Sequence, residues 1–109
     1  MRQGGNYEVF VGTATETVQD KNFGNNNLSY VIIATNDDLA NSFYLHLSLT
    51  QAASGVTSAM VADPETNSLI EVKAGEVLTI EGNYRQLAIV CGAGLTAVYR
   101  TWVFQMGVQ

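Results

Sequence analysis

Cysteine, proline, histidine and tryptophan each occur once in this sequence of 109 residues. A single cysteine, Cys91, excludes an internal disulfide and any metal site that needs several cysteines. It lies in the apolar run 87–91 without a cationic neighbour, so a small buried hydrophobe is expected there rather than a reactive thiol. The single histidine, His46, shares one side of a predicted strand with Tyr44 and Ser48. Neither a catalytic partner nor a second metal ligand adjoins it in the sequence.

Positive charge is also scarce, and the formal net charge is −5. The five basic residues are scattered, at Arg2, Lys21, Lys73, Arg85 and Arg100. Binding to nucleic acid and attraction to an anionic membrane both require clustered lysine and arginine. No nucleic-acid partner and no membrane partner is therefore expected.

Long apolar runs are missing as well. None approaches the ~18 residues of a transmembrane helix, and the polar, glycine-rich start does not resemble a signal peptide. The chain is therefore expected to be made in a cytoplasm, and to remain there or to be assembled there into something larger.

No segment shows a sustained helical period, whereas threonine, valine, isoleucine and tyrosine alternate with asparagine and glycine turns. Strands are predicted at 7–11, 28–35, 43–49, 69–72, 77–81, 86–91 and 96–104. The stretch 13–18 could extend the first strand beyond a bend at Gly12, and 56–62 could be a short strand or a single helical turn. Short strands at this spacing predict an all-β, antiparallel β-sandwich of jelly-roll or Greek-key type.

The length fits one domain with one core, and 47% hydrophobic residues can supply it. Residues 1–6 are predicted to form a flexible N-terminal arm and residues 7–109 the single sandwich domain. The asparagine-rich stretch 20–27 is predicted to be a loop. The stretch 51–67 is long for a loop without secondary structure, which suggests an interaction loop.

The acidic pairs Asp37–Asp38 and Asp63 with Glu65 lack the spacing of a calcium loop and are expected to be solvated turn residues. A pair of carboxylates that lie far apart in the chain stays possible, as in glycoside hydrolases. The stretch 92–94 lacks the lysine and the following helix of a phosphate loop, so it is predicted to be a hairpin turn. No enzyme activity, no cofactor and no metal are expected.

In the last predicted strand, Arg100 and Trp102 share one face with Val98 and Phe104, and Tyr99 lies on the other. Since both faces carry large apolar groups, this strand is either central in its sheet or covered on one side by another chain. Arg100 must pair with a carboxylate or reach the surface, because a buried unpaired charge is costly, and it could stack on Trp102. The candidate interface residues are Tyr44, His46, Arg100, Trp102, Tyr7 and Asn6.

Five stretches taken together carry a resemblance to a known group of proteins. They are TATETV, the strand YVIIATNDD, FYLHL, the hairpin EVKAGEVLTIEG, and GAGLTAV near the end. The chain resembles, from about Tyr7 to Phe104, the small all-β virion proteins of tailed bacteriophages. These proteins serve as capsid decoration or cement proteins, head-fibre bases, or tail and adaptor components, and they contribute no catalytic residues to transfer.

The resemblance implies a capsid decoration protein that stabilises the head lattice. The implied partners are the major capsid protein or other virion proteins and further copies of the chain, with a trimer favoured. The implied location is the virion, assembled in the host cytoplasm. A tail, neck or baseplate component is the alternative within the virion. A carbohydrate-binding sandwich module, with Tyr44, Tyr84 and Trp102 as stacking platforms, is the alternative from another class.

Overall fold

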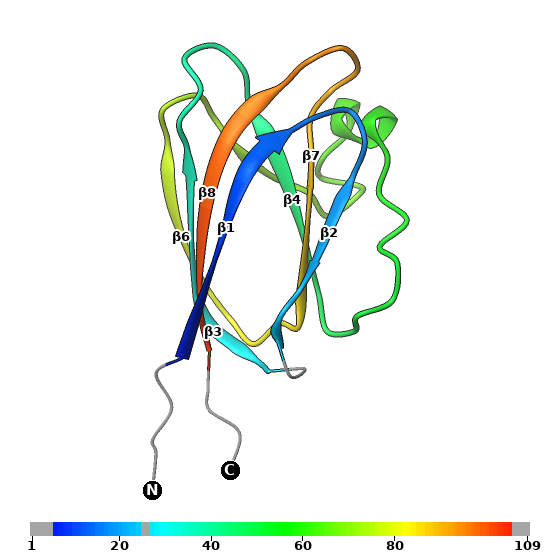
Figure 1. Ribbon diagram of the computed structural model, residues 1–109. Coiled ribbons are helices and arrows are strands. Elements are labelled where there is room, and N and C mark those ends of the chain that lie inside the picture. The colour runs from blue at the N-terminus through cyan, green and yellow to red at the C-terminus, as the bar shows by residue number, and fades with distance from the viewer. Residues whose placement is uncertain (1–5, 25–26, 106–109) are drawn as a thin grey trace, which may run out of the picture.

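The computed structural model describes residues 6–24 and 27–105, which form two four-stranded antiparallel sheets packed face to face (Figure 1). The strands are β1 (Asn6–Ala14), β2 (Gln19–Asn22), β3 (Ser29–Asn36), β4 (Phe43–Ser48), β5 (Ile70–Val72), β6 (Val77–Glu81), β7 (Gln86–Val90) and β8 (Ala97–Gln105).

The strand order is that of a jelly roll. Sheet I has the order β1-β8-β3-β6, and sheet II has the order β2-β7-β4-β5. The chain passes from one sheet to the other at most of its turns, so neighbours within a sheet are distant in sequence, as β1 and β8 are. The predicted all-β, antiparallel β-sandwich is confirmed.

The core lies between the sheets and follows from alternation along each strand. In β8 every second residue is buried, and in β7 all five residues are buried because this strand is covered on both sides. Tyr99 lies at the centre, with its ring 5.8 Å from that of Phe43. Its hydroxyl donates a 2.7 Å hydrogen bond to Oε1 of Gln19, which satisfies a polar group that would otherwise be costly to bury.

The predicted loop at 20–27 is wrong in its first part. Gln19–Asn22 is strand β2, which pairs along its whole length with β7. These polar residues have low strand propensity, but the backbone partner supplied by β7 overrides it. Phe23, which follows, is buried in the core, and its amide donates to the carbonyl of Arg85.

Strand β1 differs from the prediction at both ends. It runs through Gly12 without ending and stops at Ala14, so 15–18 form the turn into β2 rather than more strand. Glycine at position 12 leaves room for the ring of Tyr99, since an added Cβ atom would lie 3.0 Å from its hydroxyl and the ring would have to shift. The strand begins at Asn6, paired with Gln105, so this residue belongs to the sheet and not to an arm. The rest of the predicted arm lies outside the described residues.

The segment 49–69 crosses the outer side of sheet II, where it forms the green trace at the right of Figure 1. It contains a short 3₁₀ helix, η2 (Ser58–Ala62), so the helical alternative for this stretch is confirmed. The strand predicted at 43–49 ends one residue earlier, at Ser48, and the side chain of Leu49 is 64% exposed. No helix in the described part of the chain has the length and hydrophobicity to cross a membrane.

Candidate functional site

The outward-facing side of sheet I is apolar over most of its area. Its central row consists of the cross-strand neighbours Val9, Trp102, Ile33 and Thr79, contributed by β1, β8, β3 and β6. The rows on either side add further apolar groups: Tyr7, Val11, Val31, Val77, Val98 and Phe104. This surface is called the outer face of sheet I below. Several of its side chains are well exposed, including Tyr7 at 60% and Val11 at 65%.

The two sheets differ in what lies over them. On the outer side of sheet II, Val56 and Leu69 of the segment 49–69 pack on Ala88 and Val90 of β7. No segment within 6–24 or 27–105 forms such a layer over sheet I (Figure 1). Monomeric proteins rarely leave a large contiguous apolar patch in contact with water, and such a patch marks an interaction site. The outer face of sheet I is therefore the candidate functional site.

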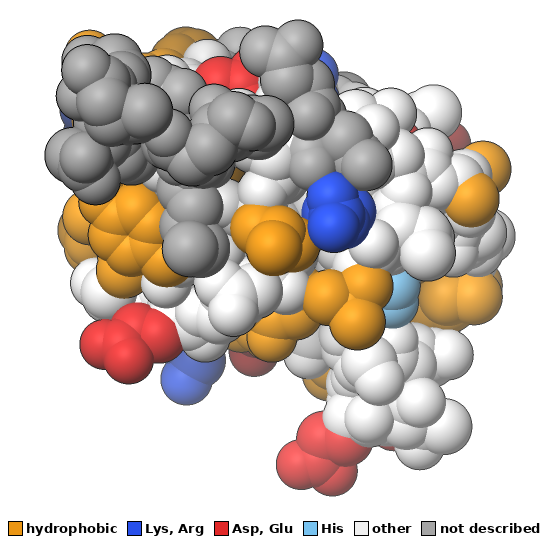
Figure 2. Space-filling model, turned by 90° about the horizontal axis from the view of Figure 1, so that it is seen from below, with side chains coloured by type: hydrophobic (Ala, Val, Ile, Leu, Met, Phe, Trp, Pro, Cys, Tyr) orange, Lys and Arg blue, Asp and Glu red, His pale blue; other side chains and the backbone are white. Residues whose placement is uncertain are grey.

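Aromatic rings gather at one end of this face. Phe104 lies 5.9 Å from Tyr7 and 6.5 Å from Tyr30, measured between ring centroids. An irregularity in the pairing of β3 with β8 lies between Ser29 and Val31, and it leaves Tyr30 42% exposed beside Phe104. Figure 2 shows this end of the sandwich, where hydrophobic side chains reach the surface among polar groups and a few charged ones. Such rings have few rotatable bonds and are effective anchors at interfaces.

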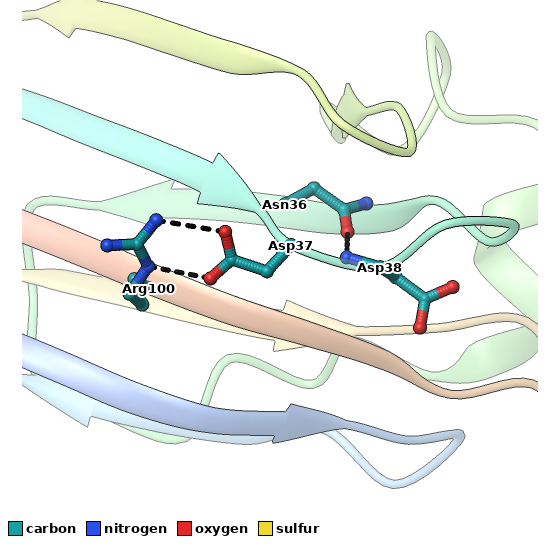
Figure 3. Close-up of polar contacts among 4 residues, drawn as sticks. All are labelled: Asn36, Asp37, Asp38 and Arg100. Atoms are coloured by element: carbon teal, nitrogen blue, oxygen red, sulfur yellow. Dashed lines mark hydrogen bonds and ion pairs between the residues drawn. The ribbon is translucent and has the colours of Figure 1, made fainter.

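The face carries one cation, and this cation is already paired. Nε of Arg100 donates a 2.6 Å hydrogen bond to Oδ2 of Asp37, and Nη2 of Arg100 donates a 2.9 Å hydrogen bond to Oδ1 of the same carboxylate (Figure 3). The guanidinium also lies 5.1 Å from the ring centre of Trp102. The hydrogen bonds from Arg100 lower the pKa of Asp37, and the carboxylate raises the pKa of Arg100. Of the two alternatives expected for Arg100, a carboxylate partner or access to the surface, the structure shows both, since the paired side chain is 45% exposed. The possible contact with Trp102 is also present.

The backbone after β3 positions this carboxylate. The amide of Asp37 donates to the carbonyl of Val98, which ties the turn to β8. Asn36 accepts a 2.8 Å hydrogen bond from the amide of Asp38 through its side chain (Figure 3). The carboxylate of Asp38 in turn accepts from the amides of Ala40 and Asn41, and these hydrogen bonds lower its pKa. The predicted solvated turn is thus an ordered one.

Tyr7, Arg100 and Trp102 are brought together on the outer face of sheet I, and Asn6 begins the strand that carries Tyr7. Tyr44 and His46 lie instead on the other side of the molecule, in β4 of sheet II. The sequence analysis missed most of the valines of the face. Their alternation in the first strand was a signal that could have found them.

Tyr44 was expected to be an exposed interface anchor, but it is partly buried against the cluster of Val56, Leu69 and Val90. The chain itself supplies the covering segment. Burial raises the pKa of Tyr44, and the nearby carboxylate of Glu71 raises it further. His46 lies next to Tyr44 on β4, and its Nδ1 is buried without a hydrogen-bond partner among the described residues.

No metal site is assembled in the described part of the chain, and its thiol is buried. Within 6–24 and 27–105, no group of three or more histidine, cysteine or acidic side chains could hold a metal ion. Cys91 is fully buried, and burial raises the pKa of its thiol to about 11. The aromatic residues considered for sugar stacking do not share a surface, because Trp102 and Tyr44 lie on opposite sheets and Tyr84 packs against the core.

The sequence matches no protein-family model, and it matches no curated protein. Among solved structures, the fold is similar to a chain from a structure described as "Bacillus endospore appendages form a novel family of disulfide-linked pili". The TM-score is 0.57, the sequence identity is 8%, and the match covers 100% of this chain and 93% of that chain. At this identity the likeness supports the β-sandwich fold alone.

Proposed function

We propose that this protein is a non-enzymatic structural subunit of a larger protein assembly, held in place through the outer face of sheet I. One observation carries the proposal: the described residues leave an apolar face of sheet I open, although they cover the corresponding face of sheet II. Burying apolar surface stabilises a contact by roughly 25 cal/mol per Å². A rigid face of this kind suits a subunit that binds its neighbours by burying apolar surface and that needs no catalytic residues.

The size of the face is adequate for this role. At about 4.8 Å between strands and about 3.4 Å per residue, its strands of nine, nine, eight and five residues cover about 500 Å² in projection. Side chains that project from the sheet make its accessible surface larger than this projected area. A specific interface buries about 800 Å² of accessible surface on each partner, so the two areas are comparable. The paired charges of Arg100 and Asp37 also suit a contact, because neither has to be desolvated alone.

The specific assembly that we propose is the virion of a tailed bacteriophage, with the protein decorating the capsid. The resemblance of the strand and hairpin motifs to small all-β virion proteins supports this choice. The partner is then the major capsid protein. By binding across neighbouring capsid subunits, the protein would stabilise the lattice, since a ligand that binds only the assembled state shifts the equilibrium toward it.

The test is binding of the purified protein to heads of tailed phages that lack their decoration protein. We expect saturable binding and a higher temperature of head disruption, and we expect Trp102→Ala to weaken both. Leu49→Ala is the matched control, because it truncates an exposed apolar side chain away from the face. Equal binding by both variants would argue against the face. Failure to bind any head would argue against the capsid, and rings or tubes of the isolated protein would favour a tail, neck or baseplate component.

A second candidate is a subunit of an extracellular fibre, supported by the likeness in fold to a chain of Bacillus endospore appendages. That structure is described as disulfide-linked, whereas the thiol of Cys91 is buried in the folded chain. A fibre of this protein would therefore have to be held by non-covalent contacts. Electron microscopy of the concentrated protein tests this candidate: filaments that persist under reducing conditions support it, and their absence opposes it.

A further inference from the structure

Strand β1 is an edge strand that lacks the usual protection against pairing with another chain. The sheet edges in the described structure are β1 and β6 in sheet I, and β2 and β5 in sheet II. Three of these edges are short, with three, four and five residues, whereas β1 has nine. Natural edges are protected by shortness, proline, lysine, a charged side chain that points inward, or a covering segment. Of these, β1 has only the inward carboxylate of Glu8, which is hydrogen-bonded within its own subunit. The sequence of β1, NYEVFVGTA, contains no proline and no basic residue.

The hydrogen-bonding groups on the open side of β1 can be assigned from one contact. The carbonyl of Thr13 accepts a 2.8 Å hydrogen bond from Nε2 of Gln19 in β2, so it points away from β8. In an antiparallel pair, successive residues direct their backbone groups alternately toward and away from the partner strand. The amides and carbonyls of Tyr7, Val9 and Val11 therefore also point away from β8, which is the only strand beside β1 in the described structure.

The side chains of this strand are complementary to a second copy of the same strand. If two copies of β1 lie antiparallel with Val9 opposite Val9, then Tyr7 of each copy lies opposite Val11 of the other. Aromatic and β-branched pairs of this kind stabilise neighbouring strands. No two like charges lie opposite each other in this register, because Glu8, the one charged residue of β1, lies opposite Phe10 of the other copy.

Glu8 is moreover already engaged inside its own subunit. Its carboxylate accepts a 2.7 Å hydrogen bond from the amide of Gly24 and a 2.5 Å hydrogen bond from the side chain of Gln105. The carboxylate thus points into the sandwich, away from the strand's open edge. For an acidic protein, whose copies repel one another over most of their surface, this neutral edge is a place where two copies can approach.

We propose that two copies of this chain associate through β1, antiparallel and with Val9 opposite Val9, so that their two copies of sheet I join into one eight-stranded sheet. The pair is closed and twofold, in place of the trimer that the resemblance implies. The inference goes beyond the proposed function and does not depend on it, because it uses the edge of the sheet. The outer face of sheet I stays open and becomes a continuous surface across both copies.

The first test is Val9→Pro, with Val9→Thr as the matched control. Proline removes the amide that points to the second copy and leaves the hydrogen bonds between β1 and β8 in place, since an edge strand tolerates proline when its amide faces outward. Light scattering on a sizing column should give a dimer for the unmodified protein and for Val9→Thr, and a monomer with an unchanged circular dichroism spectrum for Val9→Pro. A monomer or a trimer for the unmodified protein would overturn the proposal.

The second test does not depend on whether the proline variant folds. Opposite residues that exchange hydrogen bonds have Cα atoms about 5.5 Å apart, within the ~4.4–6.8 Å range of disulfides. Under mild oxidation, Val9→Cys should give a covalent dimer, and Val77→Cys, on the opposite edge and more exposed than Val9, should not. A dimer that Trp102→Ala dissociates and Val9→Pro preserves would place the second copy on the outer face instead. Because Trp102→Ala should keep the dimer but lose attachment to heads, the two proposals can fail separately.

Discussion

Arg100 is fixed on both sides: its guanidinium donates two hydrogen bonds to Asp37 and lies 5.1 Å from the ring centre of Trp102. The strand β8 that carries Arg100 and Trp102 is central in sheet I, and Asp37 follows the neighbouring strand β3. A cation in the middle of the face is therefore neutralised by its own subunit and lies over an aromatic ring. Arg100 can thus enter a contact with a partner without leaving its own charge unpaired.

The first prediction concerns this pair of charges. Asp37→Asn should leave thermal unfolding nearly unchanged at neutral pH, because exposed ion pairs contribute little to stability. It should weaken attachment to a partner, since Arg100 would enter the contact without its carboxylate. The double variant Asp37→Asn, Arg100→Met should recover attachment, because it removes the unpaired charge. Binding to undecorated heads is the measurement, and a double variant that binds no better than the single one would contradict the explanation.

The second prediction separates the outer face from the core. Ile89→Ala should lower the free energy of unfolding by about 2–5 kcal/mol, since Ile89 is fully buried between the sheets. Trp102→Ala should lower it by only about 1–2 kcal/mol, because this ring keeps part of its surface in water. Urea unfolding followed by circular dichroism gives both values. A loss for Trp102→Ala as large as that for Ile89→Ala would mean that Trp102 is needed chiefly for folding.

The third prediction concerns the pH dependence of stability in alkaline solution. Burial raises the pKa of Cys91 from 9.0 to about 11, and the charge of Asp38 adds to the effect. The folded state therefore favours the protonated thiol. Its contribution is complete below pH 9 and is lost as pH rises from 9 toward 11, because the unfolded chain releases this proton first.

The comparison with Cys91→Ala isolates that contribution, since burial also raises the pKa of Tyr99 in the same direction. Between pH 9 and 10 the unmodified protein should lose more stability than the variant. The native thiol should also react slowly with a thiol reagent at pH 8 and quickly in denaturant. Parallel pH profiles for the two proteins, or fast labelling of the folded protein, would show that Cys91 is more accessible than its burial implies.

The fourth prediction concerns two turn glycines. Gly75 has a φ of +75° with open space around it, so Gly75→Ala should cost only about 1–2 kcal/mol, the penalty of left-handed backbone. Gly82 has a φ of +154°, and an added Cβ would lie 2.5 Å from the ring of Tyr84, which packs against the core. Gly82→Ala should therefore lower the melting temperature more than Gly75→Ala does, and the reverse order would contradict the packing of Tyr84.

The β-sandwich could be predicted from the sequence because most of its strands show a recognisable pattern of apolar and polar residues. Phe43 and Leu45 alternate with polar or amphipathic residues in β4, and β8 has apolar groups on both sides, as expected for a central strand. Glycine at 75 and 94 marked turns correctly, since both have positive φ. These features are local, so residues close in the sequence decide them. The predicted hairpins at these turns are wrong, however, because β5 and β7 lie in sheet II whereas β6 and β8 lie in sheet I.

The predictions that were wrong concern features that depend on contacts between segments distant in the sequence. Strand β2 is polar and became a strand only because β7 offered a partner. Tyr44 and Trp102 look alike in the sequence, since each lies on the second side of an amphipathic strand. The first is covered by the segment 49–69 and the second is open, and alternation alone cannot say which outer face a loop crosses. The candidate site was therefore found only in part, and its partner stays a prediction.

The covering segment also gives the molecule a defined orientation. If attachment uses the outer face of sheet I, the turn at 63–68, on the side of sheet II, faces away from whatever lies beneath. Glu65, Thr66 and Ser68 in that turn are exposed, and exposed polar turns tolerate inserted sequence. A peptide inserted there would be displayed toward the solvent on every copy, which makes this protein a one-sided display scaffold.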